Sequence, residues 1–208
     1  MTPNTTAPDR IGTASPQVPV RVRVRMATDL GDIVVELDSA RAPRTVAAFL
    51  EQVDRGAYDG GSFGRIVRAD NDRGSPTIEV IQASCASGIE QRADVPLETT
   101  DETGLRHDDG TLSLPRSAGG HGSAQSFFLC IGCQPALDKG GGRIADGLGF
   151  AAFGRVIEGM DTARAIHRIK TVEDAPTDYL RGQLAADPVV IRRMARDSQA
   201  ARPPVMSC

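Results

Sequence analysis

Two polar residues that could hydrogen-bond a ligand interrupt two apolar, strand-like segments between residues 62 and 84. The stretch is SFGRIVRADNDRGSPTIEVIQAS, with Arg65 in the first segment and Gln82 in the second. Because alternate residues of an extended chain share a face, we expect Arg65 to point the same way as Phe63 and Val67, and Gln82 the same way as Val80. Strand arginines commonly lay their methylene groups on apolar surface and hold the charge in water, so position alone assigns Arg65 no function.

A G-x-S-x-G pattern at Gly60–Gly64 has the outline of a hydrolase nucleophile elbow. Such an elbow joins a strand to a helix, whereas the order expected here is helix, turn, strand. The three histidines, His107, His121 and His167, show no paired carboxylate in the sequence pattern. The pattern therefore indicates a turn before a strand rather than a serine hydrolase.

Cys130-x-x-Cys133 ends the apolar segment SFFLCIGC. Redox pairs with this spacing begin a helix, and a structural zinc site needs two more ligands, so a buried strand cysteine is the preferred interpretation of Cys130. A thiol-based sensor stays a distant alternative. The glycine-rich loop KGGGRIADGLG lacks the following helix that a dinucleotide site requires.

The arginines Arg21, Arg23 and Arg25 alternate with apolar residues and could contact phosphates. No aromatic residues lie between them and the net charge is −3, so a solvated strand face is preferred and no nucleic-acid partner is expected. The acidic run at Asp70–Asp72 lacks the spacing of a calcium loop. We expect neither a metal nor a cofactor.

Cysteine content and targeting signals in the sequence predict the cellular location of the protein. With four cysteines in 208 residues, the sequence does not suggest a disulfide scaffold, and a reducing compartment is the simpler expectation. The first residues contain no charged start followed by an apolar region, and no segment approaches the roughly twenty apolar residues of a membrane span. We expect a soluble, cytoplasmic monomer with no membrane partner, or a periplasmic or secreted protein if a signal segment is missing.

Hydrophobic periodicity divides the chain into a disordered tail at 1–19, a folded domain at 20–197 and a second tail at 198–208. VRVRVRMAT and DLGDIVVELD predict a hairpin, and PRTVAAFLEQVD and GMDTARAIHRIK predict amphipathic helices. About eight strands and two principal helices occur without regular alternation. A mainly β domain, a closed eight-stranded antiparallel β-barrel capped by two α-helices, fits best because closure removes the sheet edges.

Motif order adds a family resemblance. G-x-I-x-x-E-L, A-P-x-T-x-x-x-F, Y-D-G-x-x-F-x-R, SFFLCIG and GFAAFGRVIEGMD follow one another between Val22 and Ile169 as they do in cyclophilins. The resemblance implies an eight-stranded barrel and a peptidyl-prolyl cis-trans isomerase that acts on proline-containing segments of unfolded or flexible proteins. It implies that Arg65 is the catalytic residue. The substrate-binding positions that it implies are Gln82, Val80, Glu79, Arg116, Ser126, Phe128, Leu137 and Phe150.

The chemistry of proline isomerisation suits an arginine. Amide resonance opposes rotation with a barrier of roughly 18 to 20 kcal/mol, and in the twisted transition state the proline nitrogen regains a lone pair. A donor aimed at that nitrogen is therefore rewarded only in the transition state. Arginine supplies a rigid, permanently charged fork of donors, so no nucleophile or proton transfer is needed.

The sequence also departs from familiar cyclophilins. The loop RADNDRGSPT lengthens the connection between Arg65 and Gln82, and Glu79 is placed where it could hold Arg65 in an ion pair. Arg116 stands where an asparagine is common, Ser126 where a glutamine is usual, Ala136 at the place of a pocket-rim tryptophan and Phe150 at that of a histidine. A non-catalytic module that binds proline peptides on the same barrel is therefore the alternative function.

Overall fold

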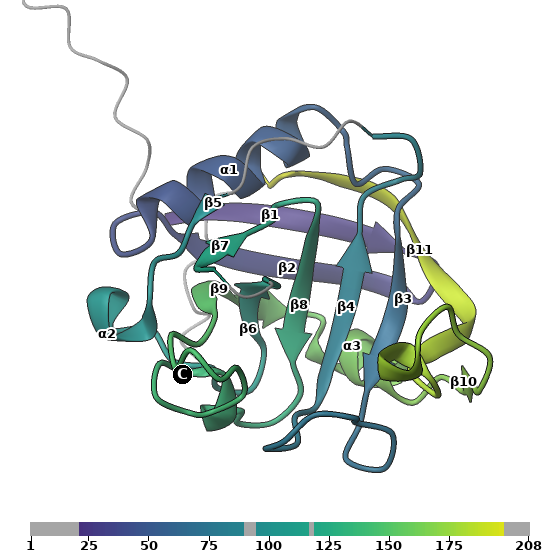
Figure 1. The fold of residues 1–208 in the computed structure, drawn as a ribbon. Helices are drawn as coiled ribbons and strands as arrows, with labels where there is room; N and C mark the ends of the chain where they lie inside the picture. The colour runs from purple at the N-terminus through teal and green to yellow at the C-terminus, as the bar shows by residue number, and fades with distance from the viewer. Residues whose placement is uncertain (1–20, 90–94, 117–118, 198–208) are drawn as a thin grey trace, which may run out of the picture.

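The computed structural model describes residues 21–89, 95–116 and 119–197, and its centre is a closed antiparallel barrel (Figure 1). Pairing between β1 and β11 closes a ring of eight strands in the order β1-β2-β9-β6-β8-β4-β3-β11. This ring confirms the predicted barrel, while the predicted tails at 1–19 and 198–208 lie outside the described residues. The barrel strands are β1 Arg21–Thr28, β2 Gly31–Asp38, β3 Ser62–Val67, β4 Val80–Ser84, β6 Thr111–Leu114, β8 Ser126–Cys130, β9 Ala151–Glu158 and β11 Leu184–Arg196.

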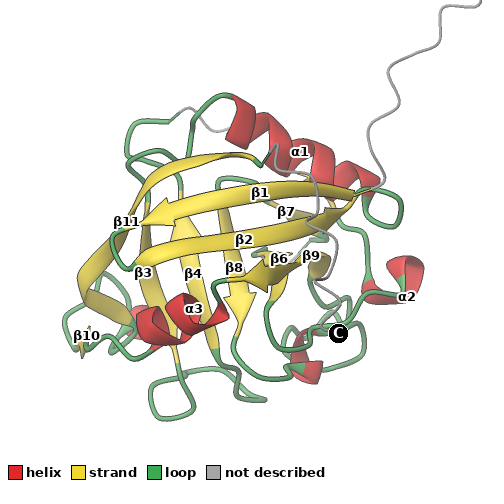
Figure 2. Cartoon of the chain, turned by 180° about the vertical axis from the view of Figure 1, so that it is seen from behind, coloured by secondary structure: helices red, strands yellow, loops and turns green. Residues whose placement is uncertain are grey.

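Two amphipathic helices pack on the barrel as predicted, and Figure 2 shows them on the outside of the strands. Helix α1, Pro43–Asp54, starts with a proline whose missing N–H costs nothing at that position, and it buries Phe49 and Leu50. Helix α3, Met160–His167, buries Ala163 and Ile166. No described helix has the length and apolar character needed to cross a membrane.

Several short elements complete the described chain. Helix α2, Thr100–Thr103, was not predicted, although Thr99 and Glu102 form a capping box whose T-x-x-E signature is present in the sequence. The other elements are β5 Val95–Pro96 paired with β7 His121–Gly122, β10 Thr171–Val172 paired with β11, and 3-10 helices at Pro135–Leu137 and Asp178–Leu180.

Alternation in β1 holds as predicted. Val22, Val24 and Met26 are buried in the barrel interior, and the intervening arginines lie on the outer face. Arg21 donates to Glu36 of β2 at 2.6 Å, and Arg25 donates to Asp32 at 3.0 Å. The arginine stripe is therefore a strand face whose charges are paired with carboxylates.

The predicted face of β3 is wrong for Phe63. A register shift between Phe63 and Arg65 marks a bulge in the pairing with β4. Because a bulge adds one residue, strict alternation fails across Gly64, and Phe63 joins Ile66 in the barrel interior. Arg65 and Val67 remain on the other face, outside the barrel. The bulge thus separates a core phenylalanine from the residue expected to do chemistry.

Candidate functional site

A second apolar cluster, separate from the barrel interior, forms on the outer face of β3, β4 and β8. It includes Val80, Phe128, Leu137 and Phe150, all of them buried, with Ile144 packed against it. A cavity of about 180 Å³ opens over this cluster. We call it the Arg65 pocket; its lining consists of Arg65, Ile78, Val80, Gln82, Pro115, Arg116, Phe128, Leu137, Arg143, Ile144, Phe150 and Tyr179.

Two amide oxygens hold the guanidinium of Arg65 at the wall of this pocket. Arg65 Nε donates to Gln183 Oε1 at 2.9 Å, and Nη1 donates to Gln82 Oε1 at 3.0 Å. The third nitrogen, Nη2, is buried and has no hydrogen-bond acceptor among the described residues. Buried donors are normally paired, so Nη2 is the nitrogen of Arg65 that is left for a further acceptor.

Strand pairing brings the predicted residues together. Arg65 lies opposite Gln82 in the β3–β4 ladder, and Gln82 lies opposite Phe128 in the β4–β8 ladder. Directly opposed residues have Cβ atoms about 4.5–5.5 Å apart, so the sheet places the donor, the amide and the apolar floor side by side. The structure brings six of the predicted site residues together in the lining of one pocket: Arg65, Val80, Gln82, Phe128, Leu137 and Phe150.

A buried polar trio supports the pocket floor. His107 Nδ1 lies 2.8 Å from Asp138 Oδ1, and His107 Nε2 lies 3.0 Å from Ser113 Oγ. The imidazole is stacked on Phe128 with ring centroids 6.1 Å apart. The sequence pattern had revealed no carboxylate partner for His107. Because Ser113 is fully buried, this trio cannot present a nucleophile to solvent. Its contact with the pocket is the packing of the His107 ring beside Phe128.

Arg116 closes the side of the pocket formed by Phe150. Its guanidinium lies 5.7 Å from the Phe150 ring centroid and donates two hydrogen bonds to Asp146, at 2.6 and 2.8 Å. Hydrogen bonding to Arg116, helped by the backbone N–H of Leu148, lowers the pKa of Asp146 to about 2. The positive charge of Arg116 is therefore neutralised by a carboxylate that stays ionised.

The long loop between β3 and β4 is latched to the loop at residues 139–149. Asp72 and Arg143 form a bidentate ion pair with both contacts at 2.7 Å, and their side chains are 0% and 4% exposed. Burial alone would raise the pKa of Asp72, but Arg143 and the backbone N–H groups of Gly74 and Ile78 outweigh it and lower that pKa. We call the Asp72–Arg143 ion pair the latch. Ile78 of the first loop and Arg143 of the second both line the pocket, so the latch holds both loops at its wall.

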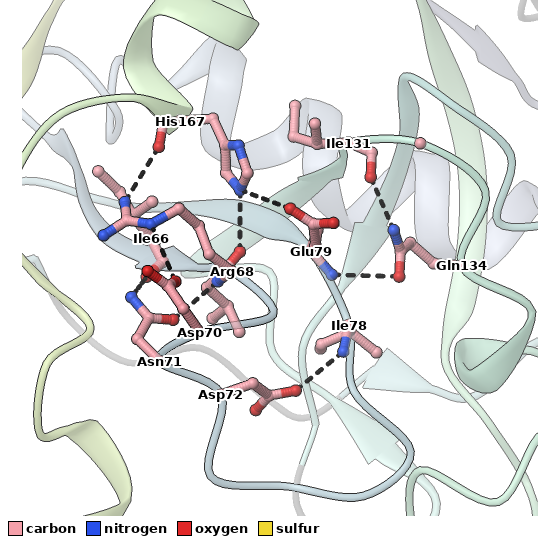
Figure 3. A network of polar contacts seen from close by, with 12 residues as sticks. Ile66, Arg68, Asp70, Asn71, Asp72, Ile78, Glu79, Ile131, Gln134 and His167 are labelled. Atoms are coloured by element: carbon pink, nitrogen blue, oxygen red, sulfur yellow. Dashed lines mark hydrogen bonds and ion pairs between the residues drawn. The ribbon is translucent and has the colours of Figure 1, made fainter.

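A second set of hydrogen bonds attaches the first residues of the β3–β4 loop to neighbouring elements (Figure 3). Arg68 donates to the carbonyl oxygens of His167 and Ile169 at the end of α3, each at 3.1 Å. Asn71 donates to Ile66 and to Gly182 at 3.1 and 2.8 Å. The loop is therefore fastened to α3, to β3 and to the segment before β11.

Two residues predicted to bind substrate lie elsewhere. The carboxylate of Glu79 faces His167 at 3.7 Å, and no described contact joins Glu79 to Arg65, so the ion pair considered from the sequence is absent there. Strand alternation explains this, because Val80 takes the pocket face and its neighbour takes the opposite one. Ser126 lines a separate polar depression with Cys85 and Gln125.

Five residues of the pocket lining were not predicted from the sequence, and neither was Gln183, which anchors Arg65; the five are Ile78, Pro115, Arg143, Ile144 and Tyr179. Tyr179 lies in a 3-10 helix, and Gln183 lies 118 residues from Arg65 along the chain, so both reach Arg65 only through folding. No pattern in the segment TDYLRGQLA indicates which residues it contacts.

Cys130 is a buried cysteine in a strand, as predicted. Cys130 is buried in β8 and Cys133 is exposed. Burial, with Asp138 nearby, raises the pKa of the Cys130 thiol well above its usual value. A thiol held in this state is a poor nucleophile, which weakens the sensor alternative.

Comparison with known proteins identifies the family of this chain. Residues 23–192 match the family described as cyclophilin type peptidyl-prolyl cis-trans isomerase/CLD, and the chain belongs to that family. It is 35% identical over 149 residues to peptidyl-prolyl cis-trans isomerase cyp18 of Streptomyces antibioticus, covering 71% of this chain and 84% of the relative. It is 28% identical over 170 residues to peptidyl-prolyl cis-trans isomerase A of Dickeya dadantii, covering 81% of each.

Solved structures agree on the fold. A cyclophilin type peptidyl-prolyl cis-trans isomerase of Cryptosporidium parvum superposes with a TM-score of 0.65 at 19% identity, covering 86% of this chain and 99% of that one. Its structure in the presence of the dipeptide Ala-Pro gives a TM-score of 0.66. The family and its relatives confirm the predicted activity, and the chain is a peptidyl-prolyl cis-trans isomerase.

Proposed function

We propose that this isomerase accelerates rotation about exposed X-Pro bonds by presenting Arg65 Nη2 to the twisted amide. The observation that supports this mechanism is the buried Nη2 without an acceptor, at the wall of an apolar pocket. In the planar ground state the amide nitrogen has little lone-pair density, whereas the twisted state regains it. A fixed donor therefore stabilises the transition state more than the substrate.

The pocket would hold the proline ring on its apolar side. Phe128 forms the floor, with Phe150 packed edge-on against it at 5.7 Å between ring centroids. Val80 and Leu137 complete the wall. Apolar surroundings bind the ring by burial and also lower the local dielectric, which strengthens the interaction between Arg65 and the amide.

Gln82 would orient the substrate backbone. Its Oε1 accepts from Arg65 Nη1, and no described residue accepts a hydrogen bond from its NH2 group. The amide can thus donate to a peptide carbonyl while it holds the arginine. One side chain links substrate alignment to the position of the catalytic donor.

The test is magnetisation-exchange NMR on a short X-Pro peptide with wild type, Arg65→Ala and Arg65→Lys. Removing one preorganised transition-state donor lowers kcat by roughly 10²- to 10³-fold in other enzymes, and we expect a loss of that order for Arg65→Ala. Lysine keeps the charge but not the fork, so only partial activity should return.

The controls separate this mechanism from the alternative. A wild-type protein that binds the peptide without accelerating exchange would favour the non-catalytic binding module. Equal acceleration by wild type and Arg65→Ala would show that Arg65 is not the catalytic residue. Peptide titration of both variants tests whether the pocket itself is intact.

A further inference from the structure

Tyr179 covers one face of the Arg65 guanidinium. It lies in the 3-10 helix at Asp178–Leu180, between β10 and β11, a connection that runs beside the end of β3 (Figure 1). The ring centroid is 4.9 Å from Arg65 Cζ, within the range of cation–π interactions. The side chain is nevertheless 49% exposed, so its ring is not part of a packed core.

The charges around Tyr179 are positive. Burial alone would raise the pKa of its phenol, but the neighbouring guanidinium groups of Arg65 and Arg143 outweigh burial and lower that pKa. The Arg143 charge is already paired with Asp72. Arg65, in contrast, has no carboxylate partner among the described residues, and it donates to the amide oxygens of Gln183 and Gln82.

The segment that carries Tyr179 also carries the main anchor of Arg65. Gln183, four positions further along, accepts from Arg65 Nε at 2.9 Å and donates to Asn71 O at 3.0 Å. Nε and Nη1 each donate one hydrogen bond, and neither bond packs an atom against the face of the guanidinium. A ring against that face restricts tilting of the group out of its plane.

We propose that Tyr179 is a positioning residue for Arg65. The ring of Tyr179 fixes the plane of the Arg65 guanidinium so that Nη2 is presented to the Arg65 pocket. The inference rests on the catalytic role proposed for Arg65. The aromatic face also excludes water from one side of the guanidinium without adding a negative charge. Arg65 is thereby held in place while its full positive charge is kept for the substrate.

The experiment compares Tyr179→Phe, Tyr179→Leu and Tyr179→Ala by NMR exchange, with kcat and KM measured separately. Phenylalanine keeps the π face, and leucine keeps apolar bulk without it. We expect Tyr179→Phe to stay within about twofold of wild type at neutral pH. A cation–π contact of ordinary strength corresponds to roughly 3-fold to 30-fold, so Tyr179→Leu and Tyr179→Ala should lose that much in kcat with little change in KM.

A double-mutant cycle separates positioning from a general structural effect. If Tyr179 acts through Arg65, then Tyr179→Leu should cause no further loss in an Arg65→Ala background. Val190→Ala, an exposed apolar truncation on β11 away from the pocket, is the matched control and should leave kcat unchanged.

The outcomes distinguish the two proposals. Full activity in Arg65→Ala would overturn the mechanism proposed for Arg65, whatever the Tyr179 variants do. A large loss in Arg65→Ala together with an unchanged kcat in Tyr179→Leu would overturn only the role of Tyr179. Additive losses in the double mutant, or a Tyr179→Phe loss as large as that of Tyr179→Leu, would also contradict it.

Discussion

Gln183 accepts a hydrogen bond from Arg65, and replacing Gln183 with leucine should lower both the stability of the protein and its catalytic rate. Its side chain is fully buried, accepts from Arg65 Nε at 2.9 Å and donates to Asn71 O at 3.0 Å. A hydrogen bond to a charged group contributes about 1.5–3 kcal/mol, and leaving a buried carbonyl without its donor costs about 1–3 kcal/mol. We expect Gln183→Leu to lower the free energy of unfolding by about 2.5–6 kcal/mol, measured by urea denaturation.

The catalytic effect follows from the same contact. Without Gln183, Arg65 keeps one hydrogen bond to an amide oxygen, the one from Nη1 to Gln82. A positioning loss of about 1.4 kcal/mol corresponds to a tenfold fall in rate, and we expect kcat in the NMR exchange assay to fall by about that factor. Gln183→Glu tests the electrostatic part, because it keeps the acceptor but adds a negative charge beside Arg65. It should lower kcat at least as much as leucine, since the carboxylate neutralises the donor.

The matched control is Gln52→Leu in α1. Gln52 is also a buried glutamine, with 2% of its surface exposed, but its Oε1 has no hydrogen-bond partner among the described residues, and it lies away from the pocket. This change should leave kcat unaltered and stability near that of wild type. Activity within twofold of wild type in both Gln183 variants would refute the idea that Gln183 orients the catalytic arginine.

Two further predictions concern the latch and Tyr179. Asp72→Ala leaves the Arg143 side chain, 4% exposed, without its carboxylate, and breaking a buried pair of this kind costs about 3–5 kcal/mol. Urea denaturation and faster amide exchange at Gly74 and Ile78 should report it, and a cost below about 1 kcal/mol would contradict it. As pH rises through the lowered pKa of Tyr179, its phenol becomes a phenolate facing Arg65 and Arg143. Isomerase activity of wild type should then fall at alkaline pH while Tyr179→Phe keeps its activity, and superimposable profiles would count against this.

Local sequence patterns were sufficient for the elements that form through local rules. The alternation in β1, the proline start of α1 and the turn before β3 each have a signature within a few residues. The partnership of Arg65 and Gln82 could be expected because a short hairpin-like segment contains both. The capping box of α2 was also readable, since Thr99 and Glu102 have the required spacing.

The rest depends on contacts between distant segments. The bulge at Gly64 has no marker beyond the glycine itself, and it reverses the face of Phe63. Asp72 and Arg143 are separated by 71 residues, and neither a lone aspartate nor a lone arginine in a loop predicts a buried ion pair. The ion pair that Glu79 could have formed with Arg65 is absent from the described contacts for a related reason: closeness along the chain does not determine which face of the next strand a side chain takes.

The three arginines that line the Arg65 pocket differ in how their charges are compensated, and this difference supports the catalytic role proposed for Arg65. Arg116 faces Asp146 and Arg143 faces Asp72, both through bidentate carboxylate contacts. Such pairs shape a wall but leave little charge for a substrate. Arg65 is held by neutral amide oxygens and an aromatic face, which restrict its motion without cancelling its charge. Catalysis of amide rotation needs a donor that is both fixed and uncompensated, and among these three only Arg65 meets both conditions.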